Sequence, residues 1–294
     1  MPRRQVVPYS CVTVLVFSEF IHPAQMQLKT MKDYVANNWE SLAAANGLDS
    51  FDAVWSLDIG WFEEPNVRRG GWSGVSRLEL ELPDGGCEAV FIKRQQNHST
   101  RSWRHPVSGI QTFRREFCNI MLLRSFDVPT LDMLYFAERR SGRDRRAILI
   151  SRELTGYASL DHCIQYWNQS GYPDRPVWHE TLQRVAAVAR RMHQHRIQQN
   201  CFVPKHVFVG ELGGRMDIRL IDFEKAKRRW TTESALLRDL DTFNRHAPGV
   251  STTDRLRFLL AYHEQPRVNA RVRKSWNKLL ALLRKKERKQ LQSR

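Results

Sequence analysis

Two runs of alternating hydrophobic and polar residues predict a β-hairpin in the first third of the chain. Residues 75–82 alternate valine or leucine with serine and charged residues, and residues 87–93 form a second run that ends in Lys93. A period of two is typical of a strand with one buried face. Residues 83–86 read Pro-Asp-Gly-Gly, which is a turn signal between two strands. We therefore predict an antiparallel strand pair here.

The pattern then changes to helical spacing and short strands. Residues 113–125 carry hydrophobic residues at helical spacing and predict a helix. A second strand pair is expected around a charged loop at 139–146. The remaining predicted elements are strands at 133–137, 147–151, 207–209 and 218–221, and helices at 160–167, at 178–195 and from 232 onward. The order predicts an α+β fold in which a small β-rich half precedes a larger helical half, with one chain crossing near residues 151–156.

Composition agrees with a folded, globular protein. The 294 residues are 41% hydrophobic and 27% charged, which excludes a chain that is disordered throughout. The five cysteines are odd in number and form no C-x-x-C pair, so they indicate a reducing compartment rather than a disulfide framework. His193, His195, Cys201 and His206 lie close together in sequence, but their spacing matches no usual zinc ligand set, and we predict no zinc site from these four.

The first residues are interpreted as an extension of the folded part. Residues 1–30 are expected to be an N-terminal extension, or the product of an over-long start assignment. Their longest apolar run, residues 12–17, is far shorter than the ~18–20 residues that span a bilayer. We therefore predict no membrane-spanning segment.

Charge is concentrated at the other end of the chain. The net charge is +16, for which nucleic acid, an anionic membrane surface and phosphate-rich substrates are the obvious partners. Residues 266–294 contain eleven Lys and Arg residues and one acid, Glu287. Hydrophobic residues at helical spacing predict a basic amphipathic helix there, which either rests on an anionic membrane or packs its leucine stripe on the helical half. No helix-turn-helix, RRM or zinc pattern supports a nucleic-acid-binding module, so we predict no specific nucleic acid partner.

Four features occur in the order of the parts of a phosphotransfer site. Lys93 ends an apolar strand, Glu116 lies on the next helix and Asp222 follows a later apolar strand. A lysine held by a carboxylate presents a fixed positive charge to phosphates, and an aspartate at a strand end can hold Mg²⁺. The fourth feature is a stretch that lets backbone N–H groups approach phosphate, and it contains Gly70, Gly71 and Gly74. Each feature alone is common; their order favours a kinase fold.

Two segments resemble one kinase family in particular. Residues 192–208 align without a gap on the kinase catalytic-loop pattern. Within them, Cys-Phe-Val-Pro-Lys-His at 201–206, followed by Ile-Asp-Phe-Glu-Lys-Ala at 221–226, is similar to the lipopolysaccharide kinase (Kdo/WaaP) family, InaA branch. The resemblance extends over about residues 67–261.

The resemblance implies a two-lobed protein-kinase-like fold that uses ATP and Mg²⁺. The implied parts are an N-lobe at 31–152, a C-lobe at 153–265 and the basic amphipathic tail at 266–294. Lys93 and Glu116 would form an ion pair at the nucleotide, Asp222 and His206 would be metal ligands, and Cys201 would join these two as a catalytic residue. Asp239 would be a buried acid that braces the catalytic loop. The acceptor would be a sugar hydroxyl of the lipopolysaccharide inner core or another anionic glycolipid, at the cytoplasmic face of the inner membrane.

Three positions depart from the kinase pattern. Cys201 stands in place of the catalytic-loop aspartate, and losing a positioned general base typically costs ~10²–10⁴-fold in rate. His206 replaces an asparagine that would hold a second metal, and imidazole is a softer ligand than Mg²⁺ prefers. Glu224 replaces the glycine of the D-F-G motif, which favours a substrate other than a protein. Two interpretations therefore stay open: an active kinase, or a pseudokinase with a regulatory or scaffold role in envelope stress or assembly.

Overall fold

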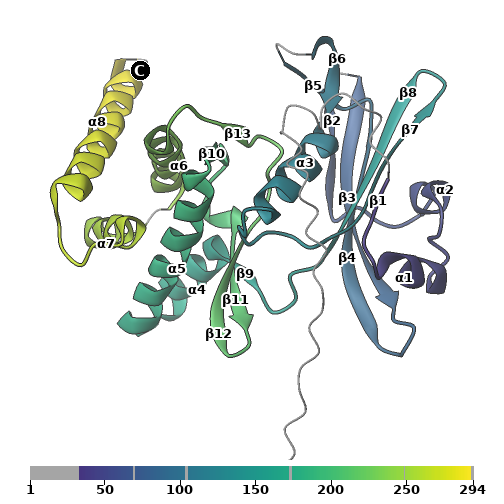
Figure 1. The fold of residues 1–294 in the computed structure, drawn as a ribbon, viewed down its shortest axis with the longest axis horizontal. Helices are drawn as coiled ribbons and strands as arrows, with labels where there is room; N and C mark the ends of the chain where they lie inside the picture. Colours follow the sequence, from purple (N-terminus) through teal and green to yellow (C-terminus); the bar gives the residue numbers. More distant parts are fainter. Residues whose placement is uncertain (1–32, 69, 103–104, 172–173, 248, 293–294) are drawn as a thin grey trace, which may run out of the picture. The chain divides into compact units, whose positions relative to one another are not determined.

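The computed structural model shows an α+β chain whose β-sheet precedes most of its helices (Figure 1). We call residues 33–152 the sheet region and residues 153–292 the helical region. The predicted N-terminal extension lies outside the described residues. Those residues are 33–68, 70–102, 105–171, 174–247 and 249–292.

The sheet region is built on a six-stranded sheet with the strand order β1-β7-β8-β4-β3-β2. All of its strand pairs are antiparallel. The strands are β1 (Tyr34–Val35), β2 (Glu63–Arg68), β3 (Gly71–Glu81), β4 (Cys87–Gln96), β7 (Met133–Ser141) and β8 (Asp144–Arg152). The predicted hairpin is confirmed, because Glu81 pairs with Cys87 where β3 turns into β4.

Each face of this sheet is covered by helices, as alternation along the strands requires. On one face, Val90 and Ile92 of β4 pack with residues of α1 (Trp39–Ala45) and α2 (Phe51–Trp55). Helix α3 (Thr112–Arg124) lies on the opposite face (Figure 1), where Phe117 stacks on Phe136 of β7. Successive side chains of β4 point to opposite faces of the sheet. Because Ile92 packs on the α1 and α2 side, Lys93 points to the α3 side.

One part of the sequence-based prediction is wrong. Residues 139–146 are not a charged loop but the ends of β7 and β8, which pair up to Ser141 and Asp144. The arginines remain in a strand because they have partners: Arg139 is paired with Asp33, and Arg146 lies 4.8 Å above the ring of Trp55. Charge alone does not make a loop when the guanidinium groups find a carboxylate or an aromatic face.

A second, two-stranded sheet precedes α3. It consists of β5 (Ser99–Ser102) and β6 (His105–Gln111). The alternation analysis did not predict this pair, since its sequence has few hydrophobic residues at a period of two.

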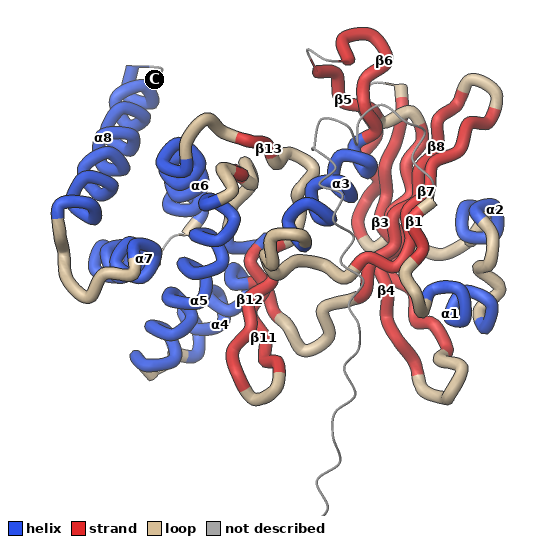
Figure 2. Tube along the Cα trace, in the orientation of Figure 1, coloured by secondary structure: helices blue, strands red, loops and turns tan. Residues whose placement is uncertain are grey.

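The described residues of the helical region form five long helices and two small sheets of short strands, β10-β13 and β12-β11-β9. Figure 2 shows these helices and strands by colour. The helices are α4 (Leu160–Ser170), α5 (Arg175–Gln194), α6 (Thr232–His246), α7 (Thr252–His263) and α8 (Ala270–Gln292). The short strands are β9 (Ala158–Ser159), β10 (Ile197–Gln198), β11 (Val207–Leu212), β12 (Arg215–Leu220) and β13 (Lys227–Arg228). The predicted helices and the strand pair β11–β12 are confirmed, with the turn at Gly213 and Gly214 rather than over the whole of 210–215.

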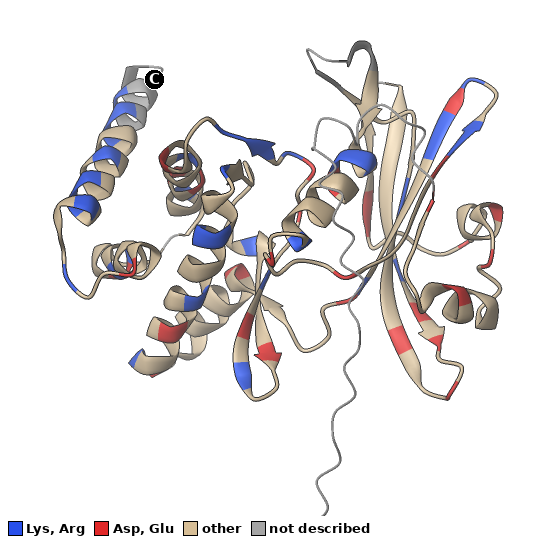
Figure 3. Ribbon diagram, viewed as in Figure 1, with Lys and Arg blue, Asp and Glu red and all other residues tan. Residues whose placement is uncertain are grey.

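The first half of the basic C-terminal helix, α8, packs on α6 and α7. Val272 and Leu279 are buried, and Ser275 is hydrogen bonded to His263 of α7 at 2.9 Å. The packing of its hydrophobic stripe is therefore confirmed. Further along, Arg284, Lys285 and Arg288 are exposed, and basic residues line α8 (Figure 3). Within the part of the chain that the structure describes, no helix is long and apolar enough to cross a bilayer.

Candidate functional site

Lys93 and Glu116 form an ion pair between β4 and α3. Lys93 is central in the sheet, paired with Val75 of β3 and Leu149 of β8. Its Nζ lies 2.6 Å from Oε1 of Glu116, whose side chain is only 3% exposed. Burial lowers the pKa of Lys93, but the nearby carboxylate of Glu116 outweighs it, so the pKa lies above its usual range. The ammonium group therefore stays charged and is held in place.

The start of α3 is held by Gln95, a residue that the motif analysis did not single out. Its Oε1 accepts hydrogen bonds from the backbone N–H of Phe113 at 3.0 Å and from Oγ1 of Thr112 at 2.7 Å. Gln95 thus caps a buried N–H group at the helix N-terminus that has no acceptor within the helix. Gln95 lies two residues after Lys93 and therefore on the same face of β4. Strand periodicity in the sequence was sufficient to place its side chain next to that of Lys93.

Asp222 follows β12 in an uncommon backbone conformation. Its φ angle is 60°, in the left-handed region that non-glycine residues rarely adopt and that aspartate tolerates better than most. Its side chain is 33% exposed, and its Oδ2 lies 3.5 Å from Nε2 of His206. The nearest ligand atoms of Cys201, His206 and Asp222 all lie within 4.8 Å of one another. The structure therefore brings the three residues predicted as catalytic into one cluster.

The protonation of this cluster is set by burial. Burial and the charge of Asp222 raise the pKa of the Cys201 thiol. Burial lowers the pKa of His206, against the opposing effect of Asp222. Burial and the charges of Asp222 and Glu116 raise the pKa of Glu224. Near neutral pH the cluster therefore holds a protonated thiol and a neutral imidazole beside a carboxylate.

The loop before Cys201 is held by Asp239 of α6. The carboxylate of Asp239 is fully buried and accepts hydrogen bonds from the backbone N–H groups of Gln199 at 2.8 Å and Asn200 at 3.0 Å. It also accepts one from Nε2 of His193 at 3.2 Å. The expectation that Asp239 braces this loop is confirmed. The bonds hold a strained segment, since Arg196 and Asn200 both have left-handed φ angles, of 62° and 66°.

Asn119 connects the ion pair to the Asp222 cluster. Its Nδ2 donates a hydrogen bond of 2.7 Å to the backbone carbonyl of Phe223, whose side chain is fully buried. Asn119 lies three residues after Glu116, so both side chains are on one face of α3. Asn119 belongs to none of the sequence motifs, although helical spacing from Glu116 indicates it.

The three glycines of the predicted phosphate-binding stretch each have a structural reason, which is backbone conformation at Gly70 and close packing at Gly71 and Gly74. Gly70 lies in the β2–β3 turn with a φ angle of 75°. A Cβ atom at Gly71 would lie 2.4 Å from backbone atoms of Gln96 and Asn97, and one at Gly74 would lie 2.4 Å from the ring of Trp61. Gly74 pairs with Arg94, next to Lys93 in the ladder. Their part in nucleotide binding stays a prediction.

The four residues His193, His195, Cys201 and His206 do not form one site. His193 belongs to the Asp239 network, and the ring of His195 stacks on Phe126 with centroids 3.7 Å apart. Cys201 and His206 instead face Asp222. Asp222 offers the oxygen ligands that Mg²⁺ takes together with nucleotide phosphates and water, whereas the thiol and the imidazole are softer ligands. Asp222 thus fits Mg²⁺, and His206 fits it poorly.

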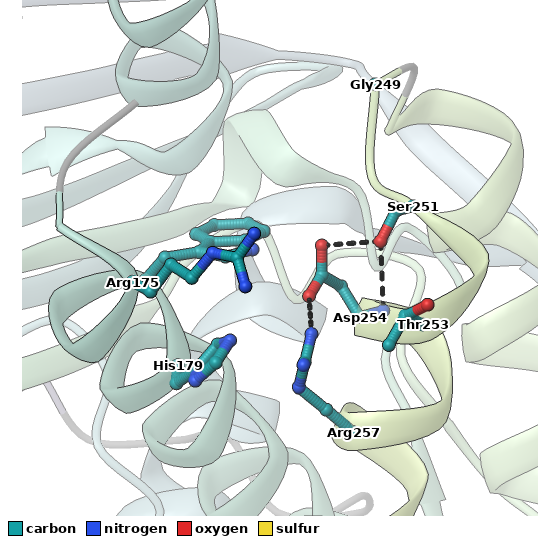
Figure 4. A pocket seen from close by; sticks show the side chains of 8 residues that line it. Arg175, His179, Gly249, Ser251, Thr253, Asp254 and Arg257 are labelled. Carbon is teal, nitrogen blue, oxygen red and sulfur yellow. Dashed lines mark hydrogen bonds and ion pairs between the residues drawn. The ribbon is translucent and has the colours of Figure 1, made fainter. Parts of the chain in front are cut away.

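A hollow of about 420 Å³ lies elsewhere, between the starts of α5 and α7 (Figure 4). Arg175, His179 and Arg257 line it. Its carboxylate, Asp254, is hydrogen bonded to Oγ of Ser251 at 2.7 Å and to Nη1 of Arg257 at 2.8 Å. Burial raises the pKa of Asp254, but these hydrogen bonds outweigh it, and the pKa lies below its usual range. This carboxylate organises the start of α7 and has no link to the Asp222 cluster.

The comparisons with known proteins agree with this geometry. The model of the Lipopolysaccharide kinase (Kdo/WaaP) family matches residues 52–262. Protein InaA of Escherichia coli (strain K12) is 26% identical over 213 residues, which are 72% of this chain and 95% of InaA. The solved structure of WaaP in complex with acyl carrier protein has a TM-score of 0.62 and 21% identity, covering 88% of this chain and 99% of that one. The α+β fold is that of WaaP, and the chain belongs to the lipopolysaccharide kinase (Kdo/WaaP) family.

Proposed function

We propose that this protein transfers a phosphoryl group from ATP to a sugar hydroxyl of the lipopolysaccharide inner core, or of a related anionic glycolipid. Membership in a kinase family implies a phosphotransferase that uses ATP. The observation that carries the proposal is the Lys93–Glu116 ion pair, joined through Asn119 to the segment that holds Asp222. The ammonium group that would bind the nucleotide phosphates and the carboxylate that would bind the metal are thus connected by hydrogen bonds through α3.

Within this proposal each residue has a separate task. Glu116 holds the ammonium group of Lys93, which binds and orients the nucleotide phosphates. Asp222 holds Mg²⁺, which when bound would neutralise phosphate charge. Cys201 and His206 lie where the acceptor hydroxyl would approach. Since the thiol is protonated near neutral pH, transfer would depend mainly on positioning and on charge.

Nucleotide binding is the first test. We expect Lys93→Met to lower the affinity for MgATP at least about tenfold in calorimetric titrations, because it removes the fixed cation. Lys278→Met is a matched control. Lys278 also lies 2.6 Å from a glutamate, Glu233, but on the α6–α8 contact, and its loss should leave MgATP binding unchanged. Equal affinities for wild type and Lys93→Met would contradict the proposal.

The acceptor is tested in cells. Core oligosaccharide from cells with and without the protein is compared by mass spectrometry, with a strain that carries Lys93→Met as a control. A phosphate present only when the wild-type protein is present supports the proposal and locates the modified sugar. Identical phosphorylation in all three strains argues against an inner-core substrate.

A pseudokinase is the second candidate, and the Cys201 thiol favours it. Its raised pKa makes it a poor proton acceptor at neutral pH. Such a protein would bind nucleotide and act as a regulatory or scaffold protein in envelope stress or assembly. Cys201→Asp separates the two candidates: transfer to a lipopolysaccharide acceptor that occurs only in this variant supports the pseudokinase. Transfer by the wild-type protein supports the kinase.

We further propose that α8 associates peripherally with the anionic inner membrane from the cytoplasmic side. The exposed Arg284, Lys285 and Arg288 support this, since each basic residue near an anionic surface contributes about 1 kcal/mol. Reversing all three to glutamate should weaken sedimentation with phosphatidylglycerol vesicles about a hundredfold. The control reverses three exposed arginines elsewhere, namely Arg140, Arg143 and Arg215. Equal losses in both variants would indicate that net charge alone is responsible.

A further inference from the structure

The tautomer of His206 follows from one hydrogen bond. Nδ1 of His206 lies 2.9 Å from the backbone carbonyl oxygen of Cys201. A carbonyl oxygen only accepts, so Nδ1 carries the hydrogen. In the neutral ring this leaves the lone pair on Nε2, which faces Oδ2 of Asp222 at 3.5 Å. A hydrogen bond from the opposite ring nitrogen to a backbone carbonyl is also how metal-binding histidines are oriented in proteins.

The two facing acceptor atoms are spaced so that one cation could lie between them. A nitrogen lone pair and a carboxylate oxygen repel each other when neither carries a proton. Two ligand atoms that each lie about 2.1 Å from a tetrahedral metal ion are about 3.4 Å apart. The observed separation of 3.5 Å between Nε2 and Oδ2 is close to this value. The gap therefore has the width that one coordinated cation requires.

Cys201 supplies a third ligand atom with a definite preference. Its Sγ lies within 4.8 Å of the ligand atoms of His206 and Asp222. Sulfur, imidazole nitrogen and carboxylate oxygen together are a ligand set of Zn²⁺ and other thiophilic divalent cations, whereas Mg²⁺ takes oxygen. Three protein ligands leave a fourth position for water or an anionic oxygen.

We propose that Cys201, His206 and Asp222 form a binding site for one thiophilic divalent cation such as Zn²⁺. The ligands are Sγ of Cys201 as thiolate, Nε2 of His206 and Oδ2 of Asp222. The thiol proton passes to solvent when the cation binds. No change of redox state and no further reactant are involved.

The site has a regulatory consequence, which rests on the proposed function. Asp222 is shared between the thiophilic cation and the Mg²⁺ of a bound nucleotide. A cation held by Cys201 and His206 draws this carboxylate away from Mg²⁺ and occupies the place that we assign to the acceptor hydroxyl. Zn²⁺ therefore inhibits nucleotide binding in the wild-type protein and loses this effect when Cys201 is replaced.

Co²⁺ is the probe that reports the ligands directly. Added to the full-length protein without nucleotide, Co²⁺ should give visible d–d bands of a four-coordinate ion and a near-ultraviolet sulfur-to-cobalt charge-transfer band, both abolished by Zn²⁺. Cys201→Ser should remove the charge-transfer band and weaken binding at least about tenfold. Asp222→Asn should bind Co²⁺ more weakly but keep the charge-transfer band, because the sulfur ligand is still present. This second variant tests the site independently if Cys201→Ser fails to fold.

The matched control is Cys163→Ser on α4. Cys163 is half-buried like Cys201 and is also a free thiol, but it lies outside the cluster. This variant should keep both bands. Wild-type protein without a charge-transfer band, or a band lost with Cys163 rather than with Cys201, would overturn the site. Because these readings need no nucleotide, they stand apart from the MgATP titration. If Zn²⁺ binds but leaves MgATP affinity unchanged, the regulatory consequence is wrong and the cation site remains.

Discussion

Two aspartates flank the same loop, and their surroundings are opposite. Asp239 is fully buried, and its oxygens accept hydrogen bonds from two backbone N–H groups and from His193. Asp222 is one-third exposed and faces a neutral imidazole and a thiol rather than a set of donors. The first carboxylate has its bonding capacity filled by the fold itself. The second retains capacity for something that is not part of the chain.

The difference separates a structural role from a functional one. A buried carboxylate with good donors stabilises the folded state, and its removal leaves those donors unsatisfied. A carboxylate in a left-handed backbone position, next to another acceptor, contributes little to stability and stays available to a ligand. The following predictions test this contrast, beginning with the largest effect.

Replacing Asp239 should have the greatest cost. We expect Asp239→Ala to lower the free energy of unfolding by about 3 kcal/mol or more, because the N–H groups of Gln199 and Asn200 lose their acceptor. Urea denaturation measures the change. Asp222→Ala is the matched comparison and should change this free energy by less than about 1 kcal/mol. Similar losses for both variants would remove the distinction between the two carboxylates.

Breaking the Lys93–Glu116 pair should cost somewhat less. We expect Glu116→Gln to lower the free energy of unfolding by about 2 kcal/mol, below the usual cost for a fully buried pair, because the Lys93 side chain is 21% exposed. The measurement is again urea denaturation, with MgATP titration of the same variant. A loss of MgATP affinity without any loss of stability would show that the pair serves only the ligand.

Alkylation of Cys201 tests the surroundings of Asp222, the more exposed aspartate of the two. Because burial and Asp222 raise the pKa of Cys201, we expect slow reaction with iodoacetamide at neutral pH and a rate that increases with pH above neutrality. Asp222→Asn removes a negative charge beside the thiol, lowers its pKa and should raise the rate near neutral pH. Peptide mass spectrometry identifies the site. The exposed Cys87 is the internal control, and its rate should be equal in both proteins.

The smallest effect is expected at the partly exposed Glu233–Lys278 pair between α6 and α8. Glu233→Gln should change the free energy of unfolding by no more than about 0.5 kcal/mol, since both side chains of the Glu233–Lys278 pair are about 40% exposed. The hydrogen bond from Lys278 lowers the pKa of Glu233. Its stabilising contribution is therefore present at neutral pH and is lost as the pH falls through that lowered pKa. Unfolding measured at neutral and acidic pH should show the two proteins converging in acid.

Local patterns were sufficient for much of the fold. The β3–β4 hairpin and α3 follow from a period of two and from helical spacing, because each buries one continuous hydrophobic face. The strand ends at 139–146 did not follow, since their stabilisation comes from Asp33 and Trp55, which are far away in sequence. Periodicity detects an element through its own face and not through the partners of its charged residues.

The candidate site was predictable as a set of residues but not as an arrangement. Motif order and family resemblance indicated Lys93, Glu116 and Asp222, and the structure brings the two halves of this set together through Asn119. The family resemblance grouped Cys201 and His206 with Asp222, but sequence spacing did not show how their side chains meet. That contact depends on the turn of the short 3₁₀ helix Pro204–His206 and on the left-handed backbone of Asp222.

The late position of Asp239 in the chain affects the order in which parts of the protein can fold. The loop at 196–200 emerges during synthesis well before Asp239, and the backbone N–H groups of Gln199 and Asn200 lack their carboxylate acceptor until α6 is available. Segments fold cotranslationally only when their stabilising partners have been synthesised. The loop that precedes Cys201 is therefore fixed only after α6 has been synthesised. A nascent chain that ends before α6 would lack the carboxylate that holds this loop in its left-handed conformation.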